Sequence, residues 1–479
     1  AALAAAALLA ACGDKPPAVT TTDTSAGDTS VTDADTLGIP ETADYGGEAF
    51  NILSAGNVAY ADFTADETAS TPLDSAQYKR KALVEQNYGV KIAETVEKAY
   101  SSGGGPGYKR LSTDANAGDC NFDLALVAGY DVTVLAYSDY LYDLASIPGI
   151  DLSKSWWDKR ANENLAVRGV MFFTTGEITV SDNDVAFVIL FNKELRKAYD
   201  LDDPYSLVYD GEWTLDTFGA LCKTVTEDLD QNGIMDANDR FGVLVWDDSV
   251  VGIVNAAGQR CCTIAEDGTI GLTLYNETTL AALDKYFSII YDTQYALTYQ
   301  REKVDPLEMW QADKGLFWMN TMTRIPQLRG MESDFGILPY PKLNAEQQDY
   351  YTTVAPYNSQ FVCVPLIQKD IERTGIITEA LAYYGEKIVT PAYYDVNLVG
   401  QSTRDEESAD MLEIIFDNLV FDIGYYYQVG PYNKQLIRMV QERDTNFTSM
   451  YDSYKTSAER LLTVINTYYA KAVSGWEKQ

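Results

Sequence analysis

Residues 185–191 read VAFVILF and form the longest apolar strand that the sequence predicts. A helix is expected directly after this strand, from Lys193. Three shorter buried strands are predicted before it, at residues 50–53, 90–92 and 122–127, with helical segments between them. Alternating strands and helices predict an α/β body with largely parallel sheets, in which ligands bind at the carboxyl ends of the strands.

The composition excludes several classes of function. The chain has 479 residues and a formal net charge of −35, from 36 basic against 71 acidic residues. A charge of this sign repels a phosphate backbone, so we expect no nucleic-acid partner. The sequence contains no histidine, which excludes Ser-His-Asp and Cys-His catalytic systems and His-ligated metal sites. Its 34 Tyr and 7 Trp suit contacts with flat, weakly polar ligands.

The first residues are typical of a targeting segment. Residues 1–11 read AALAAAALLAA and precede Cys12. This apolar run is too short to span a membrane as a helix, but it matches the apolar part of a signal peptide. The run LLAACG around Cys12 resembles a bacterial lipobox, so we interpret residues 1–12 as a truncated lipoprotein signal peptide. We expect a lipid on Cys12 to anchor the mature protein to the outer face of the cell membrane.

A polar segment follows the predicted signal peptide. Residues 20–36 read TTTDTSAGDTSVTDADT, and thirteen of them are Thr, Ser or Asp. Such a segment cannot bury enough apolar surface to offset the entropy of ordering it. We therefore predict that residues 13–45 form a disordered tether and that the fold starts near Gly46.

Residues 228–239, DLDQNGIMDAND, have the spacing of an EF-hand-type calcium loop. Gly233 stands at position 6, where the loop turns sharply, and a predicted strand, not a second helix, follows the loop. We therefore expect a structural Ca²⁺ and not a calcium sensor; a solvated acidic turn without metal is the alternative. The final Asp makes the loop closer to those of dockerin modules. The expected ligands are the side chains at positions 1, 3, 5, 9 and 12 and the carbonyl at position 7: Asp228, Asp230, Asn232, Asp236, Asp239 and Ile234.

Three further segments carry a resemblance to a known family: FNKEL at residues 191–195, GEWTLDTF at 211–218 and FGILPYPK at 335–342. Together with the lipobox, they make the chain similar to the family 1 extracellular solute-binding proteins of ABC importers. The resemblance is to the maltose-binding-protein-like class in its Gram-positive lipoprotein form. It implies a two-lobed, periplasmic-binding-protein-like clamp of type II, with crossing strands between the lobes and a ligand cleft between them. It also implies permease subunits as partners and no catalysis.

The resemblance allows the two lobes to be assigned along the chain. Lobe 1 is expected at residues 46–183 together with about 358–400. Lobe 2 is expected at residues 184–357 together with about 401–479, and it contains the calcium loop at 228–239. We expect the protein to act as a monomer.

In such a clamp, the loops at strand ends that face the cleft bind the solute. Sugars suit the residues found there, because their rings stack on Trp and Tyr while Asp, Asn and Arg take the hydroxyl groups. The candidate ligand-binding residues are Tyr130, Asp182, Asn183, Trp246, Asp247, Trp318, Asn320, Arg324 and Tyr357.

We expect a lipid-anchored solute-binding protein that delivers a carbohydrate, an oligosaccharide by preference, to an ABC permease. One alternative is a surface glycoside hydrolase, which needs only two carboxylates. No acid pair in a repeated barrel pattern supports that alternative. The other is a calcium-dependent surface glycan-binding or adhesion protein without a transporter.

Overall fold

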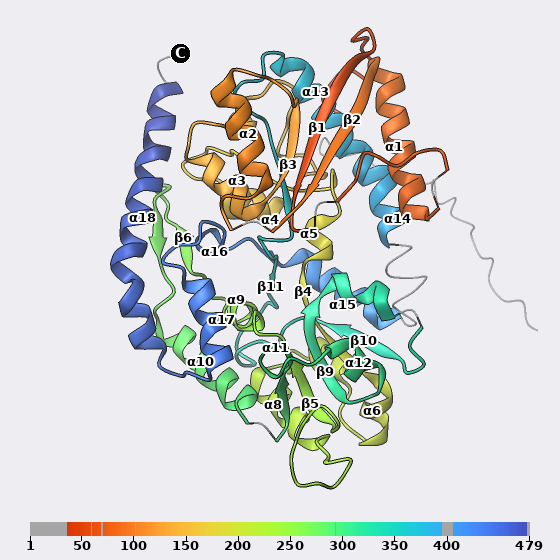
Figure 1. Ribbon diagram of the computed structural model, residues 1–479, viewed down its shortest axis with the longest axis vertical. Helices are drawn as coiled ribbons and strands as arrows, with labels where there is room; N and C mark the ends of the chain where they lie inside the picture. Colours follow the sequence, from red (N-terminus) through yellow and green to blue (C-terminus); the bar gives the residue numbers. More distant parts are fainter. Residues whose placement is uncertain are drawn as a thin grey trace, which may run out of the picture. The chain divides into compact units, whose positions relative to one another are not determined.

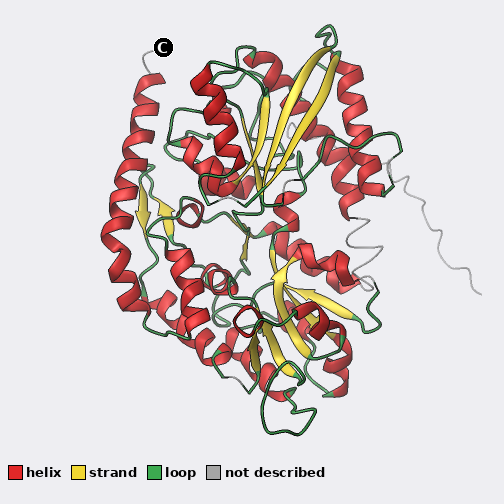
Figure 2. Ribbon diagram, viewed as in Figure 1, coloured by secondary structure: helices red, strands yellow, loops and turns green. Residues whose placement is uncertain are grey.

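The computed structural model describes residues 36–58, 60–68, 70–100, 102–292, 294–328, 330–394 and 406–476. The predicted signal peptide with Cys12 and most of the predicted tether lie outside these residues. From Leu37 onward the described residues belong to one compact unit, in which helices cover two main sheets (Figures 1 and 2). No helix among them is long and apolar enough to cross a membrane.

The first sheet has four strands in the order β12-β3-β1-β2. β1 pairs in parallel with β2 and β3, and β12 runs antiparallel to β3. Helices α1 and α13 lie together on one face, and α2 and α3 lie on the other (Figure 1). The bounds are β1 (Glu48–Gly56), β2 (Val90–Lys98), β3 (Leu124–Ala128), β12 (Gln360–Cys363), α1 (Pro72–Tyr88), α2 (Pro106–Ala117), α3 (Gly129–Ala136) and α13 (Ile371–Tyr384).

The segment before β1 is part of the fold. Residues 37–45, which the sequence assigns to the tether, lie against the end of α1. The backbone amides of Ala43 and Tyr45 donate to carbonyls of α1, the Tyr88 hydroxyl donates to the Pro40 carbonyl, and Ile39 is buried. The body therefore begins near Leu37, because apolar side chains that the Thr/Ser/Asp segment lacks reappear there.

The second sheet has five strands in the order β10-β4-β9-β5-β8. The predicted strand VAFVILF supplies β4, but β4 runs antiparallel to both of its neighbours. Only β5 pairs in parallel, with β8 and β9, so the sheets are mixed where the sequence predicted largely parallel pairing. The bounds are β4 (Phe187–Asn192), β5 (Phe241–Val245), β8 (Ala296–Thr298), β9 (Gly315–Thr321) and β10 (Phe335–Leu338).

Further helices, short except for α10, α15, α17 and α18, and two small sheets surround the two main sheets. The helices are α4 (Lys159–Leu165), α5 (Ser181–Asp184), α6 (Lys193–Ala198), α7 (Pro204–Tyr209), α8 (Leu215–Thr224), α9 (Ser249–Ala256), α10 (Glu277–Ile290), α11 (Tyr299–Glu302), α12 (Pro306–Gln311), α14 (Thr390–Tyr394), α15 (Glu406–Asp417), α16 (Ile423–Tyr426), α17 (Tyr432–Glu442) and α18 (Phe447–Trp476). The small sheets are the hairpin of β6 (Cys262–Ile264) with β7 (Ile270–Leu272) and the parallel pair of β11 (Thr352–Thr353) with β13 (Leu419–Val420).

Crossing segments connect the two main sheets. The chain passes from the first to the second sheet through α5 and returns through β11. The two crossings touch, because Ala186 forms a bridge with Val354 and the Ala355 amide donates to the Val185 carbonyl. The α/β fold with two sheets joined by crossing strands is therefore confirmed.

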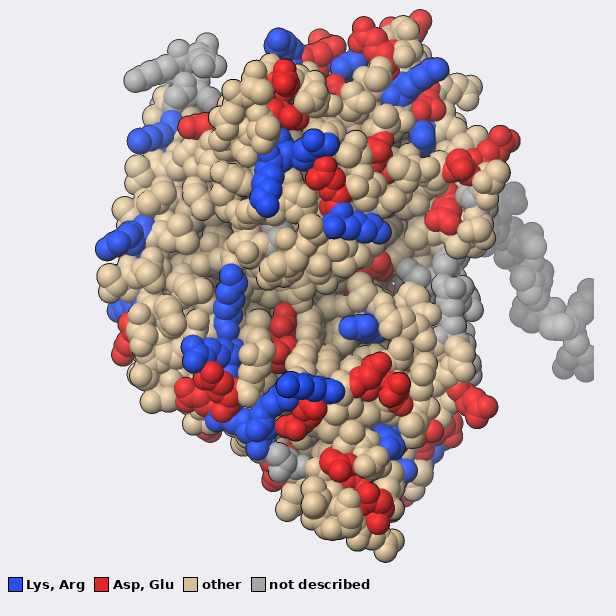
Figure 3. Space-filling model, viewed as in Figure 1, with Lys and Arg blue, Asp and Glu red and all other residues tan. Residues whose placement is uncertain are grey.

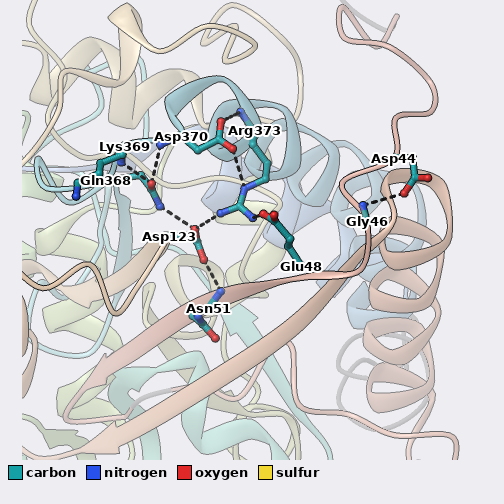
Figure 4. A network of polar contacts seen from close by, with 9 residues as sticks. All are labelled: Asp44, Gly46, Glu48, Asn51, Asp123, Gln368, Lys369, Asp370 and Arg373. Atoms are coloured by element: carbon teal, nitrogen blue, oxygen red, sulfur yellow. Dashed lines mark hydrogen bonds and ion pairs between the residues drawn. The ribbon is translucent and has the colours of Figure 1, made fainter.

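A buried ion pair fastens α13 to the first sheet (Figure 4). Asp123 lies just before β3, and its carboxylate accepts hydrogen bonds from Arg373 and Gln368, each at 2.7 Å. Its second oxygen accepts from the Asn51 amide of β1, also at 2.7 Å. The ion pair between Arg373 of α13 and Asp123 thus holds this helix at the end of the sheet.

Candidate functional site

Tyrosines and carboxylates from both sheets meet at the carboxyl ends of the strands. Tyr130 stands directly after β3 of the first sheet, and Asp247 and Asp248 follow β5 of the second. Tyr357, on the return crossing, joins them: its ring centroid lies 6.2 Å from that of Tyr130, and its hydroxyl donates to Asp248 at 2.8 Å. The fold therefore brings three of the predicted residues together and adds Asp248.

The carboxyl groups of Asp247 and Asp248 have higher pKa values than a solvent-exposed aspartate. Burial, and next the neighbouring charge of Asp247, raise the pKa of Asp248 to about 7. Burial also raises the pKa of Asp247, whose carboxylate accepts a hydrogen bond from Gln441 at 2.5 Å. Near neutral pH the Asp248 carboxyl group is therefore partly protonated.

Residues from the C-terminal part of the chain complete the cluster. The Asn433 amide donates to the Tyr130 hydroxyl at 2.8 Å, and the Tyr425 ring packs edge-on against Tyr130 at 6.2 Å. Neither Asn433 nor Tyr425 is among the residues that the sequence predicted to bind the solute. Only the fold could place these residues opposite Tyr130.

The two candidate tryptophans differ in how deeply they are buried. Trp246 is partly buried and lies against Phe187, with ring centroids 4.8 Å apart. Trp318 is fully buried in β9 and packs on Trp310 at 5.7 Å, so the structure places it in the core of the second sheet. Trp246 is therefore the tryptophan with a face to offer a ligand.

Two other candidates are Asn320, near the end of β9, and Arg324, just after that strand. The Asn320 amide donates to the Tyr299 hydroxyl at 2.9 Å and is buried there. Arg324 is partly exposed and makes one long hydrogen bond, 3.5 Å, to Gln327. Of Asn320 and Arg324, the arginine is thus the more available for contact with a ligand.

Asp182 and Asn183 lie on α5, at the crossing between the sheets. Asp182 is 4% exposed and accepts hydrogen bonds from the Thr175 hydroxyl and the backbone amide of Asn183, both at 2.9 Å. Burial, and next the charges of Asp158 and Glu177, raise the pKa of Asp182 well above its usual range. The structure therefore places Asp182 inside the crossing and leaves Asn183 partly exposed.

The predicted calcium loop folds back on itself. One carboxylate oxygen of each of Asp228, Asp230 and Asp239 lies within 4.8 Å of the others. The Asp228 carboxylate accepts a hydrogen bond from the Gly233 amide at 2.8 Å, and its other oxygen is buried and has no hydrogen-bond partner among the described residues. Gly233 has a φ of +80°, which explains the glycine at this position.

The ends of the loop are also fixed. Glu227 and Arg240 form a backbone bridge, and the fully buried Asp239 accepts from the Leu229 and Asp236 amides at 2.9 and 2.8 Å. Ile234, whose carbonyl is the predicted ligand at position 7, is 66% exposed. These residues fit a hard cation held by oxygen ligands.

Comparison with solved structures places this geometry in a known fold. An ABC substrate-binding protein from Listeria monocytogenes in complex with cycloalternan has a TM-score of 0.54 over 88% of this chain and 99% of its own, at 13% identity. A cyclo/maltodextrin-binding protein complexed with maltotetraose has a TM-score of 0.56 over 87% and 96%, at 12% identity. The chain has the fold of the ABC-transporter solute-binding proteins.

This solute-binding fold is shared by proteins with different ligands. UgpB from Mycobacterium tuberculosis, in complex with glycerophosphocholine, has a TM-score of 0.56 over 88% of this chain and 98% of its own, at 12% identity. No protein-family model and no curated protein sequence matches this chain. Because the identities are low, the likeness establishes the fold, and the ligand must be argued from the side chains.

Proposed function

We propose that this protein binds an oligosaccharide between its two sheets and delivers it to the permease of an ABC importer. The observation that carries the proposal is the meeting of Tyr130 and Tyr357 with Asp247 and Asp248 at strand ends of both sheets. Tyrosine faces stack on sugar rings, and carboxyl groups take sugar hydroxyls. Structures of the same fold in complex with cycloalternan, maltotetraose and maltotriose support this ligand class.

Binding in this proposal requires a hinge motion. Tyr130 follows β3 of the first sheet, Asp248 follows β5 of the second, and Tyr357 contacts both residues. Because these contacts join the two sheets, a solute enters when they separate and is enclosed when they close. A solute that contacts both sheets favours the closed state over the open one. The crossing segments at α5 and β11 are the expected hinge.

In this proposal the protein catalyses no reaction. The glycoside hydrolase alternative has one observation in its favour, the adjacent carboxyl groups of Asp247 and Asp248, since hydrolysis needs a proton donor and an ionised partner. Release of shorter sugars would support that alternative, whereas binding without products supports transport. A chromatographic analysis of the same sample distinguishes them.

The test is calorimetric titration with a series from glucose to maltotetraose, followed by chromatography of the sugars. We expect saturable binding of at least one oligosaccharide and no shorter products. Asp248→Asn should weaken binding by about tenfold, the effect of losing one charge-assisted hydrogen bond. The matched control is Asp410→Asn, because Asp410 also accepts from a tyrosine hydroxyl, that of Tyr209, at 2.7 Å but on the surface. Equal affinity in the wild type and both variants would place the solute elsewhere.

We also propose that the loop at residues 228–239 holds a structural Ca²⁺. The ligands are the side chains of Asp228, Asp230, Asn232, Asp236 and Asp239 and the Ile234 carbonyl. The buried, unpartnered oxygen of Asp228 supports this proposal, because a metal would satisfy it. Bound calcium would neutralise the clustered carboxylates and fix the loop between α8 and β5.

Removal of the metal should lower the melting temperature, because a metal that binds only the folded loop stabilises the folded state. At a calcium concentration of a hundred times Kd, this stabilisation is about 3 kcal/mol. Differential scanning calorimetry with and without a chelator measures the loss, and Asp239→Asn should abolish the calcium-dependent part of it. Asp267→Asn, in an exposed turn far along the chain, is the control. An unchanged melting curve with no metal in elemental analysis would contradict the proposal.

The lipid anchor and the permease partner are further parts of the proposal. Lipidation of Cys12 would hold the protein at the outer face of the membrane, and permease subunits would receive the solute there. Cys12→Ala should move the protein from the detergent phase to the aqueous phase in a partitioning experiment. Deletion of the protein should abolish uptake of its sugar; unchanged uptake with lost surface binding would favour the adhesion alternative.

A further inference from the structure

A cavity of about 530 Å³ lies beside the calcium loop, and Tyr130, Asp247, Asp248 and Tyr357 do not line it. Its walls are the second half of that loop, the edge strand β8, and residues at or just beyond the ends of α10, α11 and α17. The floor is apolar, since Phe241, Ile290 and Leu297 face it and are each at most 4% exposed. The volume falls in the range of small-molecule sites.

Two guanidinium groups line this cavity. Arg443 follows α17, and its Nη2 donates to the Tyr291 carbonyl while its Cζ lies 5.8 Å over the Tyr291 ring. Arg301 comes from α11 and also lines the cavity. Burial, and next the charge of Arg301, lower the pKa of Arg443. Two positive groups that are close enough to disfavour each other form a binding partner for an anion.

A carboxylate also lines the cavity, and it restricts the charge of that anion. Glu302 pairs with Arg301 at 3.0 Å, with side chains 48% and 38% exposed. Such an exposed pair contributes little, so Arg301 can exchange this partner for a ligand. Glu302 would repel a second negative charge, which favours a monoanion over a phosphate or a dicarboxylate.

We propose that this cavity binds a small amphiphilic monocarboxylate, with its apolar body on the floor and its carboxylate between Arg301 and Arg443. The apolar floor would supply the affinity, and the two guanidinium groups would select the carboxylate. Thr298, at the same wall, has a hydroxyl without a hydrogen-bond partner among the described residues, and it can donate to the same carboxylate. The site is independent of the solute proposed for the tyrosine cluster.

The test uses three probes that share one apolar body: 4-phenylbutyrate, 4-phenylbutanol and 4-phenylbutylamine. Calorimetric titration of the full chain with calcium present should detect binding of the carboxylate, at least tenfold weaker binding of the alcohol, and none of the amine. Arg301→Gln and Arg443→Gln should each weaken the carboxylate by about tenfold, the loss of one charge-assisted contact.

Arg438→Gln is the matched control, because Arg438 lies on α17 in an exposed pair with Glu442 and does not line the cavity. Arg301→Gln should leave oligosaccharide affinity unchanged, which separates this site from the proposed solute site. Equal binding of the carboxylate and the alcohol, equal binding in the wild type and Arg301→Gln, or no binding of the carboxylate would each overturn the proposal.

Discussion

Two aspartates of similar burial, Asp123 beside the first sheet and Asp182 at the crossing, have opposite surroundings. Asp123 is 6% exposed and its carboxylate accepts from Arg373, Gln368 and the Asn51 amide (Figure 4). Asp182 is 4% exposed, and among the described residues it is paired with no lysine or arginine. The charges that act on it are those of other acids, Asp158 and Glu177.

The comparison shows that burial alone does not decide the state of a carboxyl group. Asp123 has a positive partner, Arg373, and this pairing makes its carboxyl group part of the scaffold. Without such a partner the acid binds a proton more tightly, and burial raises the pKa of Asp158 to about 6 and that of Glu177 to about 7. Asp158 and Glu177 therefore titrate between about pH 6 and pH 7.

The largest expected effect comes from breaking the paired acid. Arg373→Met leaves the Asp123 charge buried without a partner and should lower the free energy of unfolding by about 3–5 kcal/mol, measured by urea denaturation. Asp182→Asn removes no ion pair and should change it by less than about 1 kcal/mol at pH 7. Arg438→Met, in an exposed pair, is the control. Equal losses of unfolding free energy in Arg373→Met and Asp182→Asn would show that the two aspartates do not differ in this way.

The next effect is on the pH dependence of stability. Folding raises the pKa values of Asp158 and Glu177, so the folded chain binds more protons than the unfolded one between about pH 4 and pH 7. Their contribution to stability is complete below this window and is lost as the pH rises through it. Glu177→Gln should therefore reduce the proton uptake on folding near pH 6 by about one, measured from unfolding free energies at several pH values. Glu442→Gln, an exposed acid, should leave the slope unchanged.

The smallest effect concerns the acid at the proposed solute site. Tyr357→Phe removes the hydroxyl that donates to Asp248, and it should cost about 1 kcal/mol of unfolding free energy at pH 8, where Asp248 is ionised. The loss should be smaller at pH 5, where the acid is protonated. Tyr209→Phe, which removes the exposed bond to Asp410, should cost less at both pH values. An equal loss at both pH values for Tyr357→Phe would show that the charge of Asp248 is not involved.

The sequence alone determined features that depend on near neighbours in the chain. The apolar run at residues 185–191 predicted a strand, and β4 is there, because a buried strand is set by its own side chains. The spacing at residues 228–239 predicted which oxygens converge, and three of the expected carboxylates do, because a twelve-residue loop with glycine at its turn has little conformational choice. Its calcium stays a prediction.

Only the tertiary structure decided how distant segments combine. The antiparallel neighbours of β4 could not be predicted, because strand pairing depends on the path of the whole chain. Trp318 looked available for a ligand, yet it lies in a strand with neighbours on both edges, where every residue is buried. Asn433 reaches Tyr130 across 303 residues of chain, a contact that no local pattern encodes. The strands follow from local sequence, whereas the meeting of Tyr130, Tyr357 and Asp248 is a product of packing.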